Sequence, residues 1–328
     1  MNAQSRWSVT ERAGGLSTHE RLARDVRDGL SRNPPRIPAR WFYDEKGSLL
    51  FDEITTLDEY YPTRREHEIL ASRCPDIVAS TNASTLVELG SGTSTKTRLL
   101  LDAFTARGRP LLFAPLDVSS EILTIAAREI AEHYPSITVE AVVADFEDPL
   151  DPLPGRPGER LVAFFGSTIG NLNAAARAVL LAQIRGALAP GDHFLIGADL
   201  VKSASRLVAA YDDGDGVTAA FNRNVIEVLA RELNAEQLSP DDFDHVARWN
   251  EHESQIEMWL RARRDIHTWF PELKMPWRLS AGSELLTEIS VKFEPGQLAA
   301  ELACHQFAVT ESWTDRAGDF SVTLARAL

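Results

Sequence analysis

The feature that most constrains this chain of 328 residues is an apolar run that ends in a glycine turn. The run, Thr85 to Leu89, is rich in β-forming residues, and Gly90-Ser91-Gly92-Thr93 follows it. A helix pattern from Ser94 to Phe104 comes directly after the turn. In an open α/β sheet, this order of strand, turn and helix is found where nucleotide-like ligands bind. Glycine permits the tight turn and lets a ligand approach the backbone closely.

The turn does not match the fingerprint of dinucleotide-binding proteins, which has a third glycine three residues after the second. Thr95 occupies that place, so a nicotinamide cofactor is disfavoured. What remains resembles the first motif of the class I S-adenosylmethionine-dependent methyltransferases, E/D-x-G-x-G-x, although Thr93 stands where glycine is frequent. A turn with a purely structural role is the alternative interpretation.

Acidic residues at the ends of the next two predicted strands suit an adenosyl group. Asp117 ends the run from Pro110 and follows Gly90 by 27 residues, which fits one helix and one strand. At that sheet edge it can accept both ribose hydroxyls, or it can cap the next helix, Ser119 to His133. After the third strand, Asp145 can accept the exocyclic amine of adenine while Phe146 covers the base.

The most hydrophobic run, Leu161 to Phe165, is typical of a central parallel strand that is buried on both faces. It opens into the loop Gly166-Ser167-Thr168-Ile169-Gly170-Asn171, which supplies uncharged polar groups. This loop is expected at the crevice where substrate and cofactor meet.

The whole pattern predicts an α/β protein of two domains. Residues 64–201 with 291–328 are expected to form a Rossmann-like, seven-stranded sheet of the class I type, closed by an antiparallel hairpin. Residues 16–63 with 202–290 are expected to form a second, α+β domain that binds the substrate. Residues 1–15 are polar and glycine-containing and are expected to be flexible.

Local signals add four expectations. Thr63 is a candidate N-cap for a helix from Arg64 to about Ser72. The segment Ser283 to Ile289 suggests a short helix or turn. The acidic loop Asp212 to Gly216 lacks the ligand spacing of an EF-hand, so no metal is expected there. Neither cysteine, Cys74 or Cys304, lies in a C-x-x-C pair, and both are expected to be small buried hydrophobes.

The net charge of −14 disfavours a polyanionic partner, because phosphate contacts require clustered Lys and Arg. We therefore expect no nucleic-acid partner. The sequence shows no secretory signal and no apolar run of about 18 residues, so it predicts a cytoplasmic protein without a membrane span. The histidines show no metal-ligand spacing, and no metal cofactor is expected.

Several segments together resemble one family along most of the chain, from about residue 22 to 325. They are W-F-Y-D at 41–44, E-Y-Y-P-T-R at 59–64, L-V-E-L-G-S-G-T at 86–93, G-S-T-I-G-N at 166–171, A-Y-D-D at 210–213, F-N-R-N at 221–224, I-E-M-W-L-R-A at 256–262 and L-T-E-I-S at 286–290. In this order they resemble the bacterial L-histidine Nα-methyltransferases of ergothioneine biosynthesis. The resemblance implies trimethylation of the α-amino group of L-histidine to hercynine, with S-adenosylmethionine as co-substrate.

The resemblance also implies roles for single residues. Those that match cofactor positions are Gly90, Lys96, Asp117, Asp145 and Phe146. Those that match substrate positions are Tyr60, Gly166, Asn171, Tyr211, Met258, Glu288 and Ser290, with Glu288 and Ser290 on the imidazole. Tyr43 and Asn171 are the predicted catalytic residues. A small-molecule substrate and a monomer are expected.

The chemistry of methyl transfer agrees with this assignment. A neutral amine must be held about 3 Å from the methyl carbon, so positioning matters more than a strong base. Glu288 accepting an imidazole N–H would discriminate histidine from apolar amino acids, because an unmet buried carboxylate is costly. Three alternatives stay open: a class I methyltransferase for another small amine, a non-catalytic S-adenosylmethionine sensor, and an NAD-dependent dehydrogenase.

Overall fold

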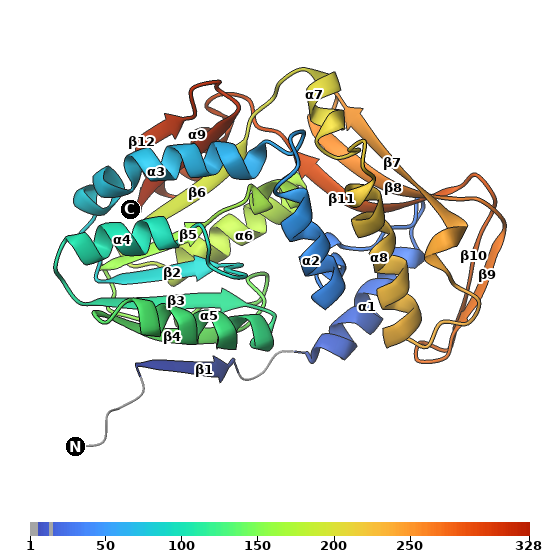
Figure 1. Cartoon of the computed structure of the whole chain (residues 1–328), viewed down its shortest axis with the longest axis horizontal. Helices are drawn as coiled ribbons and strands as arrows, with labels where there is room; N and C mark the ends of the chain where they lie inside the picture. Colours follow the sequence, from blue (N-terminus) through green and yellow to red (C-terminus); the bar gives the residue numbers. More distant parts are fainter. Residues whose placement is uncertain (1–5, 13–15) are drawn as a thin grey trace. The chain divides into compact units, whose positions relative to one another are not determined.

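A computed structural model describes residues 6–12 and 16–328 of the chain, and its contacts divide it into two compact units (Figure 1). Unit 1 comprises Met1–Gly15, Arg64–Leu200 and Phe293–Leu328. Unit 2 comprises Leu16–Thr63 and Val201–Lys292. Each unit has its own hydrophobic core.

Unit 1 is built on an eight-stranded sheet in the described residues, in the order β1-β4-β3-β2-β5-β6-β13-β12. Its strands are β1 (Trp7–Glu11), β2 (Thr85–Leu89), β3 (Leu111–Asp117), β4 (Ile137–Val143), β5 (Arg160–Phe164), β6 (His193–Asp199), β12 (Phe307–Thr314) and β13 (Phe320–Ala327). The first six are parallel, and β13 runs antiparallel between β6 and β12. This order confirms the predicted class I α/β fold, with one strand more than expected.

The additional strand is β1, which pairs in parallel with the edge strand β4. The prediction that residues 1–15 are flexible is therefore wrong for Trp7–Glu11; residues 1–5 and 13–15 lie outside the described residues. Trp7 and Val9 alternate along β1 and pack against the core of unit 1. Polar neighbours in the sequence hide this short alternation.

Helices follow the strands of unit 1, and two of them differ from prediction. They are α3 (Pro62–Ser80, whose first two residues belong to unit 2), α4 (Arg98–Ala106), α5 (Ser120–His133), η2 (Thr168–Asn171), α6 (Ala174–Ala187) and α9 (Gln297–Cys304). Helix α3 begins at Pro62, one residue before the predicted cap, because proline suits the first helical position, where no N–H is needed. Helix α4 begins after Ser94, whose left-handed φ of 53° is incompatible with a helix.

Unit 2 combines helices with two small antiparallel sheets. The helices are α1 (Thr18–Leu30), η1 (Ala39–Phe42), α2 (Glu45–Ile54), α7 (Ala204–Ala209), α8 (Val217–Glu232) and η3 (Pro240–Asp242). One sheet has the order β11-β8-β7, formed by β7 (Phe243–Asn250), β8 (Gln255–Ala262) and β11 (Glu284–Val291). The other pairs β9 (Ile266–Phe270) with β10 (Met275–Leu279).

Strand β11 contradicts the predicted short helix or turn at Ser283 to Ile289. It pairs antiparallel with β8, but its register shifts between Leu286 and Glu288. Thr287 is the additional residue of this β-bulge, and a bulge re-aims the side chains that follow it. The bulge interrupts the alternation of polar and apolar residues, which is why the sequence did not reveal a strand.

The two cysteines differ from one another. Cys74 is buried in the core of unit 1, and burial raises the pKa of its thiol to about 12. Cys304 is exposed, so the prediction of a buried side chain is wrong there. It lies at the last residue of α9, beyond the buried Leu302.

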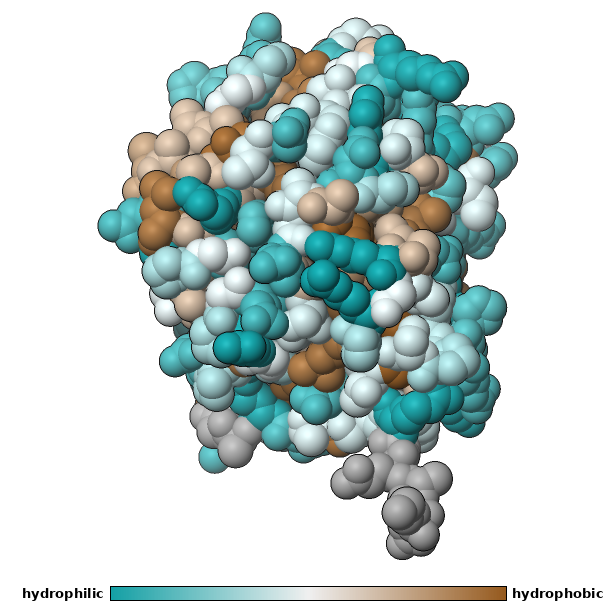
Figure 2. Space-filling model, turned by 90° about the vertical axis from the view of Figure 1, so that its left-hand side faces the viewer, coloured by the Kyte–Doolittle hydropathy of each residue, from teal (hydrophilic) through white to brown (hydrophobic). Residues whose placement is uncertain are grey.

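Hydrophilic residues cover much of the face shown in Figure 2, and hydrophobic residues lie among them in small separate groups. Within residues 6–12 and 16–328, no helix is both long enough and apolar enough to cross a membrane.

Candidate active site

In unit 1, the predicted cofactor residues lie at the carboxyl ends of neighbouring strands. Gly90 follows β2, Asp117 ends β3, and Asp145 and Phe146 follow β4. The strands are parallel and adjacent, in the order β4-β3-β2-β5, so these residues share one edge of the sheet (Figure 1). The carboxyl edge of an open α/β sheet is its usual ligand-binding edge.

The glycine turn is braced by Asp117. The N–H of Gly92 donates to Asp117 Oδ2 at 2.8 Å, and the N–H of Ser119 donates to Oδ1 at 3.1 Å. Burial raises the pKa of Asp117 although these hydrogen bonds act in the opposite direction. Ser119, not Asp117, is the N-cap of α5, since its hydroxyl accepts from the N–H of Ile122. The capping alternative for Asp117 is therefore wrong.

The backbone of the turn leaves room for a ligand beside its glycines. Gly90 and Gly92 have φ values of 66° and 49°, which glycine adopts readily. A Cβ atom at Gly92 would meet no heavy atom within 4 Å, whereas one at Gly90 would lie 3.5 Å from the Phe146 ring. Ser91 Oγ is buried and has no hydrogen-bond partner in the described part of the chain. These residues fit a ligand with hydroxyl groups.

Two acidic residues at or near the carboxyl edge of the sheet, Glu88 and Asp145, are buried. Glu88, on β2, is 4% exposed and accepts a hydrogen bond from Thr97 Oγ1, and burial raises the pKa of its carboxyl to about 8. Asp145 is also buried, and its Oδ1 accepts from the N–H of Glu147 at 2.9 Å.

The predicted residues Lys96 and Gly166 are joined by a residue that the sequence did not identify, Glu66. The Glu66 side chain is fully buried, and its Oε2 accepts from Lys96 Nζ at 2.6 Å. Its two oxygens also accept from the N–H of Gly166 at 2.9 and 3.0 Å. In the sequence, Glu66 stands three residues after Thr63, the predicted N-cap, and this spacing suggests only a capping box. Its carboxylate instead links α3, the loop after β2 and the loop after β5.

In unit 2, four of the predicted residues lie along one connected cluster. The Tyr43 ring lies 5.5 Å from Phe51, and Phe51 lies 6.1 Å from Tyr60. Tyr60 in turn lies 6.1 Å from Tyr211, whose hydroxyl is 2.9 Å from Ser290 Oγ. Tyr60 and Tyr211 are buried, whereas Tyr43 is 41% exposed. The cluster therefore connects an exposed aromatic ring to a buried pair of hydroxyl groups.

A second unpredicted residue, Lys292, completes this end of the cluster. Lys292 is fully buried, and its Nζ donates to Tyr211 Oη and to Ser290 Oγ, both at 2.8 Å. In the sequence it follows Glu288 and Ser290 at every second position, the spacing of one face of a strand. That alternation is the signal that could have identified it.

A buried network holds the backbone around these residues. Thr287 Oγ1 lies 2.6 Å from Asn222 Oδ1 and 2.9 Å from the carbonyl oxygen of Met258, so its single hydrogen is shared between these two acceptors. Asn222 Nδ2 lies 2.8 Å from His245 Nδ1, and His245 Nε2 lies 2.8 Å from the Tyr211 carbonyl. Burial lowers the pKa of His245, so the neutral ring accepts from Asn222 and donates to the carbonyl.

This network fixes strand β11 as well as Tyr211. Glu288 lies opposite Met258 of β8, directly after the bulge at Thr287. Met258 is 1% exposed and belongs to the core of unit 2. Asn171, the last residue of η2, and Gly166 belong to unit 1, whereas the other predicted substrate residues belong to unit 2.

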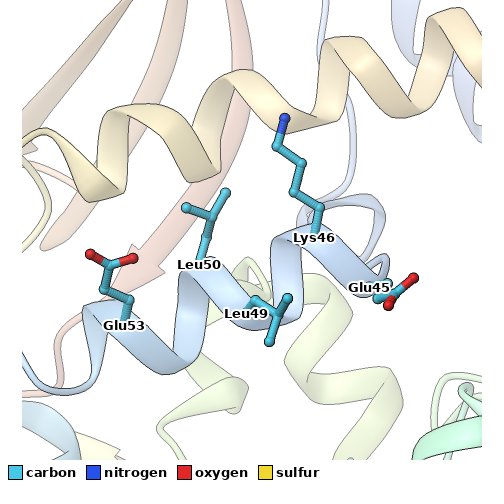
Figure 3. Close-up of a pocket in the computed structure, with 5 residues that line it drawn as sticks. All are labelled: Glu45, Lys46, Leu49, Leu50 and Glu53. Atoms are coloured by element: carbon cyan, nitrogen blue, oxygen red, sulfur yellow. The ribbon is translucent and has the colours of Figure 1, made fainter.

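Two other features of unit 2 are formed by residues for which no ligand-binding role is predicted. The acidic loop is a helix cap: Asp213 accepts from the N–H groups of Val217 and Thr218 at the start of α8. No group of three or more His, Cys, Asp or Glu residues that could hold a metal occurs in the described residues. A hollow of about 320 Å³ lies along α2 (Figure 3), lined by Glu45, Lys46, Leu49, Leu50 and Glu53.

Comparison with known proteins gives similarities over most of this chain. The model of a family described as histidine-specific methyltransferase, SAM-dependent, matches residues 22–327. Histidine N-alpha-methyltransferase of Mycolicibacterium smegmatis is 52% identical over 311 residues, which cover 94% of this chain and 96% of that protein. The protein of the same name from Mycobacterium tuberculosis is 49% identical over 320 residues, covering 98% and 99%. Ergothioneine biosynthesis protein 1 of Schizosaccharomyces pombe is 30% identical over 242 residues, covering 70% of this chain and 31% of that protein.

Proposed function

The chain belongs to the family of histidine-specific, S-adenosylmethionine-dependent methyltransferases, and on this premise we propose that it trimethylates the α-amino group of L-histidine to hercynine. This reaction would be the first step of ergothioneine biosynthesis. The observation that carries the proposal is the identity of 52% across nearly the whole length of both chains.

Unit 1 would bind S-adenosylmethionine. Asp117 would accept the ribose hydroxyls, Asp145 the adenine amine, and Phe146 would cover the base beside Gly90. Lys96 would lie near the remainder of the co-substrate, held in place by its ion pair with Glu66. The co-substrate supplies an electrophilic methyl group on a sulfonium, so the protein is left with binding and orientation.

Unit 2 would supply most of the histidine-binding residues. Glu288 would accept one imidazole N–H, Ser290 would contact the other ring nitrogen, and Met258 would pack on the ring. Tyr60 and Tyr211 would hold the amino and carboxylate groups. Asn171 and Gly166 are the proposed substrate-binding residues of unit 1.

Tyr43 and Asn171 are the proposed catalytic residues. They would hold the amine in its neutral form with its lone pair toward the methyl group, because only a deprotonated amine is nucleophilic. Tyrosine faces also favour a product that gains a fixed positive charge, which suits repeated methylation. The reaction requires no metal. We further propose that the enzyme acts as a cytoplasmic monomer on a small molecule, without a nucleic-acid or membrane partner. The charge of −14 supports the absence of a nucleic-acid partner.

The test is mass spectrometry of the purified protein after incubation with S-adenosylmethionine and L-histidine. A product with three methyl groups on the α-nitrogen is expected. Glu288→Gln should lower kcat/KM by roughly 100-fold, since the imidazole N–H loses a charged acceptor. The matched control is Glu284→Gln on the same strand, because Glu284 is paired with Arg248 and Arg261. Turnover of another amine but not of histidine would contradict the proposal.

A further inference from the structure

Arg12 joins the edge strand of unit 1 to the loop that follows β4. It stands directly after β1, and its N–H donates to the carbonyl of Val143, the last residue of β4, at 3.1 Å. Its guanidinium donates from Nη1 to the carbonyl of Pro149 at 2.5 Å and from Nη2 to that of Pro152 at 3.1 Å. One residue therefore contacts the end of a strand and two points of the loop after it.

The guanidinium group suits this place in charge and in shape. Burial lowers the pKa of Arg12, and the carboxylates of Asp151 and Asp148 act in the opposite direction. Arginine stays protonated in either case, so it is a permanent donor. Its rigid fork presents several N–H groups in one plane, and here two of its nitrogens each donate to a different carbonyl oxygen. Neither lysine nor glutamine has this fork.

The loop that Arg12 contacts carries Asp145, which is proposed to accept the adenine amine. The N–H of Glu147 donates to Asp145 Oδ1 at 2.9 Å, and the N–H of Asp148 donates to the Asp145 carbonyl at 3.0 Å. These two hydrogen bonds form a tight turn that orients the Asp145 carboxylate. Pro149 is the first residue after the turn, and its carbonyl accepts from Arg12. The turn is therefore held directly behind the carboxylate.

Other contacts hold the loop on either side of the stretch that Arg12 contacts. The Phe146 ring lies 5.2 Å from that of Phe164 on β5. At the other end of the loop, Arg160 donates to the carbonyls of residues 153–155. The contacts of Arg12 fall between these two anchors. Loss of the Arg12 guanidinium should therefore loosen the middle of the loop without unfolding unit 1.

We propose that Arg12 is a positioning residue for the co-substrate, which holds the loop after β4 in the geometry in which Asp145 and Phe146 bind the adenine of S-adenosylmethionine. This inference rests on the proposed function, which assigns the adenine to these two residues. Arg12 acts through the loop and is not a catalytic residue. Strand β1 brings the guanidinium to this place, because its pairing with β4 puts Arg12 beside Val143.

The test is calorimetric binding of S-adenosylmethionine, without histidine, to wild type, Arg12→Gln and Arg6→Gln. Arg6 is the matched control, because it precedes the amino end of β1, away from the ligand-binding edge, and donates to the Tyr134 carbonyl at 3.1 Å. Arg12→Gln should weaken binding by at least about threefold, because a loop that adopts the binding geometry only about a third of the time lowers the apparent affinity by that factor. Arg6→Gln should bind as wild type does.

Two further measurements separate positioning from a general loss of stability. In Arg12→Gln the KM for S-adenosylmethionine should rise, whereas kcat and the KM for histidine should not change, because residues 144–152 include no predicted histidine-binding residue. Hydrogen exchange in the peptide 144–152 should be faster in Arg12→Gln than in wild type or Arg6→Gln. Arg12→Lys keeps the charge but not the fork, and it should change these quantities in the same direction if Arg12→Gln fails to fold.

A smaller loss of affinity in Arg12→Gln, or an equal loss in Arg6→Gln, would overturn the inference, as would weaker binding without faster exchange in the loop. None of these results would affect the proposed function, which depends on binding of S-adenosylmethionine and turnover of histidine by the wild type. A wild type that lacks either property would instead remove the premise.

Discussion

The ion pair between Glu66 and Lys96 should stabilise unit 1 more than a surface ion pair does. The perturbations are Glu66→Gln, Lys96→Met and the double variant, which together form a double-mutant cycle. Glutamine keeps the shape of Glu66 and can still accept from the N–H of Gly166, so the cycle isolates the charge pair. The Glu66 side chain is fully buried, whereas that of Lys96 is 27% exposed.

The magnitude follows from the geometry. At the Nζ–Oε2 distance of 2.6 Å, an effective dielectric constant of about 20 gives a gross attraction of about 6 kcal/mol. Desolvation of a buried carboxylate costs several kcal/mol and cancels part of this gain. We therefore expect a coupling energy of about 2–3 kcal/mol. A single substitution at Lys96 should cost about as much, because Glu66 would stay buried with only one N–H donor.

The assay is urea denaturation followed by circular dichroism. The control cycle uses Arg73 and Asp76 on the same helix, α3, whose exposed ion pair of 3.2 Å should couple by less than about 0.5 kcal/mol. Calorimetry should show that Glu66→Gln and Lys96→Met each bind S-adenosylmethionine more weakly than wild type does. A coupling energy for these two residues no larger than that of the surface pair would refute the reasoning.

Two further predictions concern buried groups of unit 1. Gly197→Ala should destabilise the fold by about 1–3 kcal/mol and weaken S-adenosylmethionine binding, because its Cβ would lie 2.1 Å from Glu66 Oε1. Gly186→Ala is the control, because no atom lies within 4 Å of its Cβ, and it should be neutral or stabilising. The two variants are compared by thermal melts, and equal melting temperatures would contradict the clash at Gly197. Glu88→Gln should be more stable than wild type at pH 8, and its free energy of unfolding should depend less on pH. Burial raises the pKa of the Glu88 carboxyl to about 8 in the folded protein. The stability that the protonated carboxyl contributes is therefore complete below about pH 4.5 and is lost as the pH rises to about 8. In wild type, the free energy of unfolding should fall by on the order of 3 kcal/mol between pH 5 and pH 8, as measured by urea titrations at both values. An equal fall in Glu88→Gln would count against a buried, uncharged Glu88.

The sequence predicted those parts of the fold whose signal is local. The strand Thr85–Leu89 was predicted with its observed bounds, because β-forming residues end at a glycine turn. The ligand-binding residues could be predicted to share the carboxyl edge of the sheet, because a glycine or an acidic residue marks the end of each consecutive strand. The family could also be predicted, since the resemblance depended on many short segments in one order, and the comparisons confirm it.

The parts that could not be predicted depend on distant partners. Strand β11 contains a bulge, and its extended form follows from pairing with β8. Glu66 is a charged residue in an ordinary polar context of the sequence, and only the tertiary fold buries it beside Gly166. For Lys292 the alternation with Glu288 and Ser290 was available as a signal, but only the tertiary fold shows that its side chain is buried beside Ser290. The roles of the predicted site residues toward histidine and S-adenosylmethionine stay predictions.

Strand β1 has a consequence for the behaviour of the protein in concentrated solution. It covers one edge of β4, a strand that would otherwise offer unpaired N–H and C=O groups to other molecules. The new outer edge is short and carries Thr10 and Glu11, with Arg12 directly after it. Charged and polar residues of this kind discourage pairing with a second chain. We therefore expect β1, a strand of five residues, to protect this edge of the sheet from pairing with other chains.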